Sequence, residues 1–394
     1  RSPDFPATNG VFQTKNNGLQ DGVILKINPL CKALVWASYL GGAKEDAAYV
    51  IALNGLNSLY VAGGTASSDF PVKGGVIYPN YRGGVCDGFI AHVSSDGKSI
   101  IQSTFLGADN AAADQVYGIQ LDKNGFVYVM GTTEGAWPIK LLSSNYYNGN
   151  GLQFISKLQP DLSAFVYSTT FGKARNLVSS PNISPTAFLV DRCENVYVSG
   201  WGGGINTALH YPNSGTAGLY TSSDALQRST DGMDFYFFVL QRDGVAPLYA
   251  SYFGGSGLYE HVDGGTSRFD KNGIIYQGIC AWCNVSSNGS KPRYPTTPGA
   301  YSSTPPASCN FGALKIAFNL DGVKAGVKTL DRRKNYCVPE TITLVDTTRL
   351  PGPSSIWAFN DGSPNHGVTG GPELDPIQHK FTKEATLTVM MIQI

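Results

Sequence analysis

The chain alternates short apolar runs with turns rich in glycine, asparagine and aspartate, and no segment keeps the spacing of an amphipathic helix. Some runs are apolar throughout, such as Phe235–Leu240. Continuous apolar runs are typical of strands in a sheet that is covered on both faces. The turns Asp122-Lys-Asn-Gly125 and Asp270-Lys-Asn-Gly273 supply the positive φ that tight hairpins need. The pattern therefore predicts an all-β protein built from antiparallel hairpins.

Three short patterns recur in a fixed order and mark an internal repeat. In the first unit they are Asp21-Gly-Val-Ile-Leu-Lys-Ile27, Ala37-Ser-Tyr-Leu-Gly-Gly42 and Leu59-Tyr-Val-Ala-Gly63. They return at Asp87–Val93, Ser103–Ala108 and Val127–Gly131, then at Leu152–Leu158, Ser168–Lys173 and Val196–Gly200, and again at Asp234–Leu240, Ala250–Gly255 and Ile275–Gly278. A fifth copy of the first pattern, Asn310–Ile316, has no copy of the third pattern after it.

Each repeat unit reads as two hairpins. In the first unit, Gly22–Asn28 pairs with Ala33–Tyr39, and Tyr49–Leu53 pairs with Leu59–Gly63. Four-stranded sheets that repeat along a chain and are buried on both faces are the blades of a β-propeller. An open β-solenoid is the alternative, but its repeats are far shorter than these units. The paired glycines after the second strand are expected where the backbones of neighbouring blades crowd together.

At these anchors the sequence resembles the SBBP (beta-propeller) repeat family over about residues 1–330. The family pattern, roughly Y-S-T-Y-L-G-G, then D-x-x-G-N-x-Y-V-x-G-x-T, then F-P-x-T-x-G-A, is matched in each unit, with Gln277 in place of valine in the fourth. The resemblance implies a propeller. Since Asp4–Gly10 matches the connector that follows a second hairpin, we expect the sequence to start inside a repeat and the ring to need blades from residues before Arg1.

Residues 331–394 follow a different pattern and are expected to form a second domain. Trp357–Gly362, His379–Phe381 and Thr386–Val389 resemble the polycystic-kidney-disease (PKD) type of immunoglobulin-like domain, which implies a β-sandwich. The departures from the family pattern are Asn360, Phe381 and Ala385. The segment is short for a sandwich of about 100 residues. We therefore expect its last strand to be truncated or to come from residues beyond Ile394.

Composition excludes several classes of protein. Charged residues make up 15% of the 394 residues, and 29 basic residues balance 29 acidic ones. Without a basic excess, a nucleic-acid binder is not expected. The chain is too apolar and too evenly charged for a disordered protein. No apolar run approaches the roughly 18 residues that span a bilayer, so no membrane-spanning segment is expected.

The chain has seven cysteines, of which Cys280 and Cys283 form a C-x-x-C motif and Cys309 follows on a nearby loop. We expect one local disulfide among these three, in an exported protein. A zinc site lacks a fourth ligand at metal spacing, and a redox motif lacks a surrounding βαβ pattern.

Residues that could carry chemistry are few. His261, within Glu260-His-Val-Asp263, is the one local acid–base cluster and is interpreted as a loop residue, while no G-x-S-x-G motif supplies a nucleophile. Trp201–Gly204 lacks the lysine and helix of a phosphate-binding loop. The acidic loops Asp109–Asp114 and Asp231–Asp234 could hold calcium but lack EF-hand spacing, so no cofactor is expected beyond that candidate. His92 and His379 are expected to be structural, with His379 packing near Trp357.

The leading hypothesis is a non-catalytic, extracellular cell-surface protein that displays or binds. The family resemblance implies this, since SBBP repeats followed by PKD-type domains are similar to large Bacteroidota surface proteins that are exported by type IX secretion and associated with adhesion or gliding motility. Its partners would be other domains of a longer chain, other surface proteins, or glycans. One alternative is a lectin-like propeller that binds sugars through Trp201, Tyr146 and Tyr147. The other is a polysaccharide-active enzyme, which would need paired carboxylates at the ring mouth. Fold alone does not choose among them.

Overall fold

The structure is a computed structural model that describes residues 4–109, 113–142, 146, 148, 151–174, 176–177, 180–203, 214–257, 259–262, 267–283, 294–303, 309–318, 327–331, 336–346, 354–369, 376–383 and 388–393. The chain forms two compact units, Arg1–Phe318 and Asn319–Ile394. Among the described residues every element is a strand, apart from one 3-10 turn, η1 (Arg242–Gly244). The prediction of an all-β protein is therefore confirmed.

The strands of the first unit are short and follow the predicted hairpins. They are β1 (Gly22–Ile27), β2 (Leu34–Leu40), β3 (Asp46–Leu53), β4 (Leu59–Thr65), β5 (Asp87–Val93), β6 (Ile100–Leu106), β7 (Asp114–Leu121), β8 (Val127–Thr133), β9 (Gly151–Leu158), β10 (Phe165–Ala174), β11 (Ser184–Val190), β12 (Val196–Trp201), β13 (Phe235–Leu240), β14 (Pro247–Phe253), β15 (Tyr259–His261), β16 (Ser267–Phe269), β17 (Ile274–Cys283) and β18 (Asn310–Ala317).

These strands form antiparallel meanders. The strands β3 to β6 make one four-stranded sheet, β7 to β10 a second, and β11 to β14 a third, each in chain order. In the next sheet β15 and β16 both pair with β17, and β18 pairs with β17 on its other side. The hairpin β1–β2 is a two-stranded sheet by itself.

The sheets do not coincide with the sequence repeats. The sequence suggests that the two hairpins of one repeat unit share a sheet, but the structure joins the second hairpin of one unit to the first hairpin of the next. The strands β4 and β5 pair in full register from Leu59↔Val93 to Thr65↔Asp87, across a connector of irregular backbone. Each sheet therefore ties two successive repeat units together.

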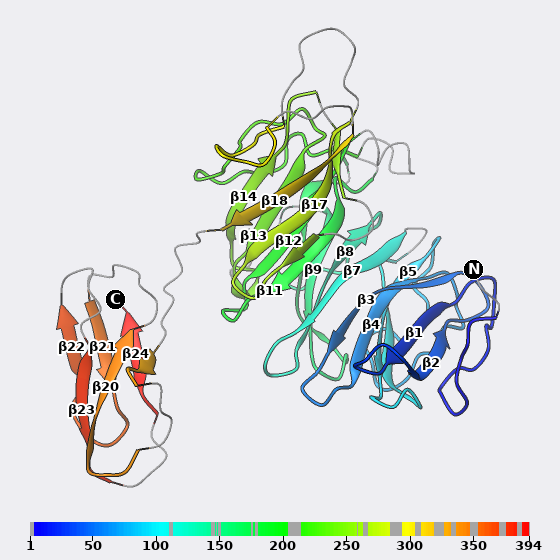
Figure 1. Cartoon of the computed structure of the whole chain (residues 1–394). Coiled ribbons are helices and arrows are strands. Elements are labelled where there is room, and N and C mark those ends of the chain that lie inside the picture. The colour runs from blue at the N-terminus through cyan, green and yellow to red at the C-terminus, as the bar shows by residue number, and fades with distance from the viewer. Residues whose placement is uncertain are drawn as a thin grey trace. The chain divides into compact units, whose positions relative to one another are not determined.

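Successive sheets pack against one another in the order of the chain. The strand β3 contacts β7, β7 contacts β11, and β11 contacts β16, so these four strands lie next to each other in succession. A separate apolar core fills each of three spaces between sheets. The first lies between β1–β2 and β3–β6, the second between β3–β6 and β7–β10, and the third between β7–β10 and β11–β14. Figure 1 shows the sheets following one another from the blue hairpin β1–β2 to the yellow-green β13, β17 and β18.

The second unit holds β19 (Val327–Thr329), β20 (Glu340–Asp346), β21 (Ser354–Ala358), β22 (His366–Thr369), β23 (Ile377–Phe381) and β24 (Met390–Gln393). These form two antiparallel three-stranded sheets, β19-β20-β23 and β22-β21-β24. Both sheets contribute to one core, which includes Leu344 and Phe381 from the first and Trp357 and Met391 from the second. Of the PKD-like pattern Thr386–Val389, Thr386 and Leu387 lie outside the described residues.

Candidate functional site

The first sheet leaves one of its faces uncovered. On β1, Ile24 points into the core shared with the next sheet, whereas Val23, Leu25 and Ile27 are 42%, 45% and 48% exposed. Leu34 on β2 pairs with Ile27 and is also exposed. Because alternate residues of a strand lie on the same face, these four side chains form one apolar surface, which we call the β1 face.

The same repeat positions are fully buried in the next sheet. Phe89, Ala91 and Val93 of β5 hold the positions that the β1 face residues hold in β1, and none of them is exposed. They pack into the core between β1–β2 and the sheet β3–β6. The β1 face is therefore of the kind that a neighbouring sheet covers elsewhere in this unit.

The edge of β1 is uncovered as well. In the part of the chain that the structure describes, β1 pairs with β2 alone, whereas its repeat equivalents β5, β9 and β13 pair with a strand on either side. An edge strand presents unpaired N–H and C=O groups that can accept another strand. The β1 edge and the β1 face together form a surface suited to another β-sheet.

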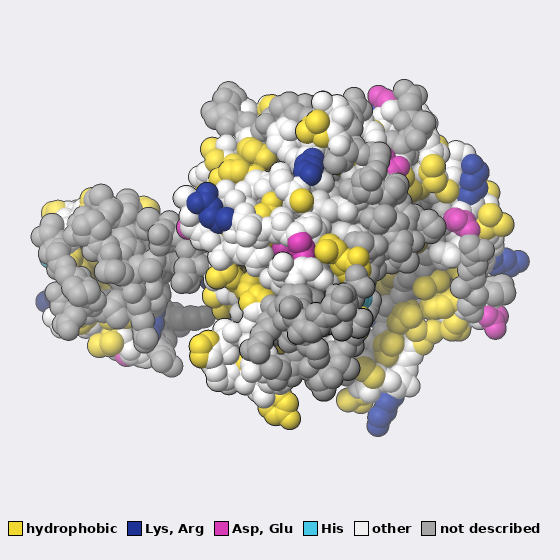
Figure 2. Space-filling model, turned by 90° about the horizontal axis from the view of Figure 1, so that it is seen from above, with side chains coloured by type: hydrophobic (Ala, Val, Ile, Leu, Met, Phe, Trp, Pro, Cys, Tyr) yellow, Lys and Arg dark blue, Asp and Glu magenta, His cyan; other side chains and the backbone are white. Residues whose placement is uncertain are grey.

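The last sheet of the first unit exposes the opposite face. Alternate residues of β18 are exposed, and Phe311 is 83% exposed. Tyr276, which pairs with Lys315, is also exposed, and the Lys315 Nζ atom lies 5.5 Å from the centroid of its ring. Figure 2 shows that the visible side of the first unit carries hydrophobic side chains in several clusters, with few charged groups among them.

The aromatic residues that the sequence suggests as sugar platforms lie mostly inside the protein. Trp201 is 7% exposed at the end of β12, and its ring lies 5.6 Å from the ring of His261. Tyr146 is half-buried beside Phe238, and burial raises the pKa of Tyr146 to about 12. Tyr147 lies outside the described residues. Buried in this way, Trp201 offers no open face for stacking on a sugar.

A different pair of aromatic residues is accessible. The rings of Tyr49 on β3 and Tyr117 on β7 stack at 5.3 Å with an interplanar angle of 8°, and Tyr49 is 45% exposed. Sequence reasoning missed this pair because the two residues come from different repeat units and meet only when the first strands of neighbouring sheets pack together.

The histidines have structural surroundings. The His92 Nε2 atom lies 2.7 Å from the Ser58 hydroxyl and its ring stacks on Tyr60 at 4.1 Å, while burial lowers the pKa of His92. In the second unit, His379 stacks on Phe359 at 3.8 Å, and its Nε2 atom lies 2.6 Å from the Asp361 carboxylate. Phe359 belongs to the same core as Trp357. Asp263, a member of the acid–base cluster around His261, lies outside the described residues. The same holds for residues 204–213, which include His210 and the end of the glycine-rich loop.

The cysteines differ in state. Cys309 is disulfide-bonded, whereas Cys280 keeps its thiol, and the side chain of Cys283 lies outside the described residues. Thiols are also present at Cys31, Cys86, Cys193 and Cys337. Burial raises the pKa of the Cys86 thiol to about 11, which keeps it protonated and unreactive at neutral pH.

The two acidic loops are occupied by contacts within the protein. Asp109 makes a 2.8 Å ion pair with Arg82, and Asp231 accepts hydrogen bonds from the backbone N–H groups of Met233 and Gly257. No group of three or more acidic, histidine or cysteine side chains converges as a metal site within the described residues. The other two loop carboxylates, Asp114 and Asp234, turn inward instead.

Sequence reasoning missed the inward carboxylates. Asp114 lies beside Asp87, and Asp234 lies beside Glu260, with each pair flanking a glycine and almost wholly buried. A glycosidase also needs paired carboxylates, but these pairs are almost wholly buried. The signals that could have revealed them are an Asp before the apolar run in the first, second and fourth units, and an acid five to seven residues after the first glycine of the second pattern.

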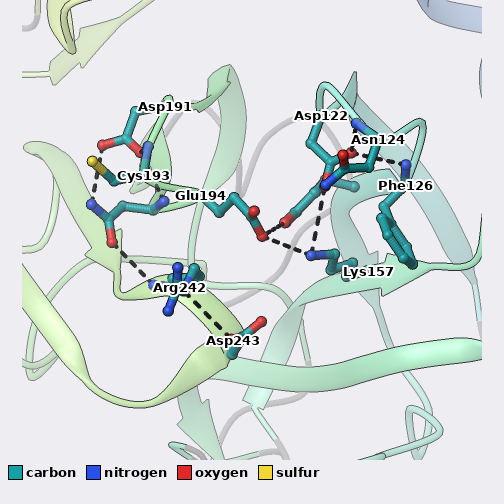
Figure 3. A network of polar contacts seen from close by, with 11 residues as sticks. Asp122, Asn124, Phe126, Lys157, Asp191, Cys193, Glu194, Arg242 and Asp243 are labelled. Atoms are coloured by element: carbon teal, nitrogen blue, oxygen red, sulfur yellow. Dashed lines mark hydrogen bonds and ion pairs between the residues drawn. The ribbon is translucent and has the colours of Figure 1, made fainter. Parts of the chain in front are cut away.

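A buried lysine joins the second and third four-stranded sheets (Figure 3). The Lys157 Nζ atom lies 2.8 Å from Glu194 Oε2 and 3.6 Å from Asp122 Oδ2, and the Tyr128 hydroxyl donates to the same Glu194 oxygen. The Lys157 ammonium also lies 4.7 Å from the centroid of the Phe126 ring. Two turns from different sheets are thus held by one cation, which is a structural role.

Comparison with known proteins gives no family. No family model and no curated protein matches the sequence. Among solved structures, the chain is similar to a polysaccharide lyase of family PL25, an ulvan lyase bound to -[GlcA(1-4)Rha3S]-, with 12% sequence identity. The likeness covers 83% of this chain and 68% of that chain at a TM-score of 0.31, a value too low to support an argument about fold or function. Among the described residues, no helix is long and apolar enough to cross a membrane.

Proposed function

We propose that this chain is a non-catalytic module of an extracellular cell-surface protein, whose first unit docks another β-sheet through the β1 face. The observation that carries the proposal is the contrast between β1 and β5. The same repeat positions are 42% to 48% exposed in β1 and fully buried in β5, where a neighbouring sheet covers them. Covering apolar surface of this kind stabilises the resulting contact by about 25 cal/mol per Å² of area removed from water.

The architecture supports assigning the first unit to the propeller class. Three of its sheets are meanders of four strands, and the strands β3, β7, β11 and β16 touch in succession, as the inner strands of radially arranged blades do. On this interpretation the repeats are of the SBBP type and the unit is a sector of a ring. The β1 face and the exposed face of β18 are then the two ends of that sector.

The second unit supports assignment to the immunoglobulin-like class. Two three-stranded antiparallel sheets share one core around Trp357, in the manner of a β-sandwich. The disulfide at Cys309 supports an oxidising, extracellular location, because such bonds persist there and are rare in reducing compartments. Adhesion or gliding motility after type IX secretion is the role that the resemblance to SBBP and PKD proteins implies.

Carbohydrate binding is the second candidate function. It is favoured by the stacked pair Tyr49 and Tyr117, since one ring of the pair is accessible and aromatic faces are suited to sugar rings. A signal on a glycan array that is lost in Tyr49→Ala would support this candidate. Turnover of a polysaccharide that a single carboxylate substitution abolishes would instead show an enzyme and contradict the non-catalytic proposal.

The docking proposal is tested by self-association, because a second copy offers a sheet of the same repeat on its exposed β18 face. In sedimentation velocity over a range of concentrations, the wild-type protein is expected to associate, and Leu25→Asp is expected to abolish association. Leu56→Asp is the matched control, since Leu56 is 83% exposed in the turn between β3 and β4 and lies away from the β1 face. A wild-type protein that stays monomeric, or equal loss in both variants, contradicts the proposal.

A further inference from the structure

The junction between the third and fourth four-stranded sheets contains two buried carboxyl groups side by side. A Cβ atom placed on Gly254 would lie 2.0 Å from Asp234 Oδ1 and 2.9 Å from Glu260 Oε2, so both oxygens adjoin one point. The residues Asp234 and Glu260 are each 1% exposed. One oxygen of each is satisfied, since Asp234 Oδ2 accepts from Gln227 Nε2 and Glu260 Oε1 accepts from the Gly255 N–H. The two oxygens that adjoin Gly254 have no hydrogen-bond partner.

Two other junctions hold related pairs of buried carboxyl groups. Each pair flanks the first glycine of the second sequence pattern, and the second acid of each pair accepts a hydrogen bond from the backbone N–H that follows that glycine. The pairs are Asp21 with Asp46 beside Gly41, and Asp87 with Asp114 beside Gly107, and all four groups are 9% exposed or less. These pairs differ from the Asp234–Glu260 pair in one respect: the Oδ2 atoms of Asp46 and Asp114, which adjoin the glycines, are the bonded oxygens, and their Oδ1 atoms are unpartnered.

The remaining junction of this kind is closed by amides. Beside Gly172 the side-chain groups are those of Gln153 and Asn182, and here the polar atoms are bonded. Gln153 Oε1 accepts from the Asn182 N–H at 2.7 Å, and its Nε2 donates to the Phe171 carbonyl at 3.2 Å. Asn182 Oδ1 accepts from the Lys173 N–H at 2.8 Å, and its Nδ2 donates to a carbonyl at 3.3 Å. Where the side chains carry their own donors, the protein closes the junction by itself.

The Asp234–Glu260 pair lacks one donor. Its two unpartnered oxygens are satisfied by a single hydrogen, bonded to one oxygen and donated to the other. A calcium ion would instead require six to eight oxygen ligands, and no three acidic, histidine or cysteine side chains converge in the described parts of the chain. We propose that the Asp234–Glu260 pair holds one proton between its two members, so that a carboxylic acid O–H donates to the neighbouring carboxylate and closes the junction between the two sheets.

The electrostatic surroundings agree with the geometry. Burial raises the pKa of Glu260 to about 8 and that of Asp234 to about 6, and each is raised further by a nearby carboxylate: Asp231 acts on both groups and Asp234 on Glu260. Burial also raises the pKa of Asp87 to about 7 and of Asp114 to about 6, and it raises those of Asp21 and Asp46. The other titratable or charged groups that face the pairs are Asp69 at the first pair, Tyr81, Arg82, Cys86 and Glu134 at the second, and Tyr252 and Tyr294 at the third.

The sign of the pH effect follows from these shifts. In the unfolded chain aspartate and glutamate lose their protons near pH 4, whereas in the folded unit the Asp234–Glu260 pair keeps a proton up to about pH 6 to 8. Between these limits the folded state binds more protons, so stability is greatest at the acidic end and falls as the pH rises. Each shared proton changes the unfolding equilibrium constant by up to about tenfold per pH unit.

The test replaces the carboxyl groups of Asp234 and Glu260 by amides, which are the groups that the protein carries beside Gly172. The unfolding equilibrium constant of the full chain is measured by urea unfolding between pH 5 and 8, in the wild type and in Asp234→Asn/Glu260→Gln. We expect this constant to change with pH less steeply in the double variant, by a factor of about ten per pH unit. Asp224→Asn is the matched control, since it removes an exposed carboxylate and is expected to leave the dependence unchanged. If the double variant fails to fold, Glu260→Gln alone and the infrared carbonyl band of protonated carboxylic acid in the wild type at pH 7 give the same answer.

Two outcomes overturn the proposal. One is a pH dependence that is identical in the wild type and the amide variant, together with no infrared band of protonated carboxyl at neutral pH. The other is stabilisation of the wild type, but not of the variant, by millimolar calcium at pH 8, which would show that the Asp234–Glu260 pair holds a cation instead of a proton.

Discussion

Two adjacent glycines in β4 give a sharp test of how tightly the strands of one sheet are packed. A Cβ atom on Gly63 would lie 1.9 Å from the Ala47 carbonyl oxygen, whereas one on Gly64 would find its nearest neighbour, a side-chain atom of Gln115, at 3.5 Å. Neither glycine has a positive φ. Gly63→Ala and Gly64→Ala therefore make the same chemical change one residue apart, with opposite steric consequences.

The magnitude follows from the distance. A Cβ atom rarely comes within about 3.0 Å of another heavy atom, so Gly63→Ala must move the backbone of β3 by about 1.1 Å. The strand β3 also contacts β7 and cannot shift freely. Overpacking costs about 1–3 kcal/mol, and a stretched ladder hydrogen bond about 1 kcal/mol more. We expect a loss of about 2–4 kcal/mol in Gly63→Ala, and a gain of about 0.4–1 kcal/mol in Gly64→Ala through the unfolded state.

Urea unfolding followed by far-ultraviolet circular dichroism measures both variants. Gly131→Ala repeats the experiment in the next sheet, since its Cβ would lie 1.9 Å from the Gln115 carbonyl oxygen. If Gly63→Ala and Gly64→Ala shift the midpoint equally, or Gly63→Ala leaves it unchanged, the close approach of β3 to β4 is not what selects glycine at this position.

Two further predictions concern single groups. Lys157→Met is expected to lower the free energy of unfolding by about 3–5 kcal/mol, because the buried Asp122 carboxylate loses its cation. The double variant Lys157→Met/Asp122→Asn should recover part of the loss in the same urea assay, and full stability in Lys157→Met would contradict the prediction. Alkylation of the unfolded, unreduced chain is expected to label the five thiols at Cys31, Cys86, Cys193, Cys280 and Cys337 and to spare Cys309, as read by peptide mass spectrometry; a labelled Cys309 would contradict the disulfide.

The sequence predicts hairpins between neighbouring segments well, but it predicts poorly which distant strands pair and which side chains meet between sheets. Hairpins such as β3–β4 follow from apolar runs and turn residues that are close in the chain, and they are predicted well. The pairing of β4 with β5 crosses a long connector, so nothing local distinguishes it from pairing within one repeat unit. Burial of Trp201 is equally invisible, since an aromatic residue at the end of a strand can face either the core or solvent.

The buried acids show the same limit more clearly. Asp21 precedes β1 and Asp46 begins β3, and they meet only because the first sheet packs on the second around Gly41. In sequence each acid reads as an ordinary turn or strand-end residue, and pairs of like charge are not expected in a core. A glycine that recurs at every junction is the local trace of the contact, because its missing Cβ leaves the space that the carboxyl groups fill.

The charge balance of the chain takes a different meaning once the junctions are considered. The formal net charge of zero counts every one of the 29 acidic residues as ionised. If the Asp234–Glu260 pair keeps a proton, the chain carries about one more positive charge at neutral pH than its composition suggests. The amide pair beside Gly172 shows that a junction can be closed without any charge. The carboxyl pair therefore adds a dependence on pH that the architecture itself does not need.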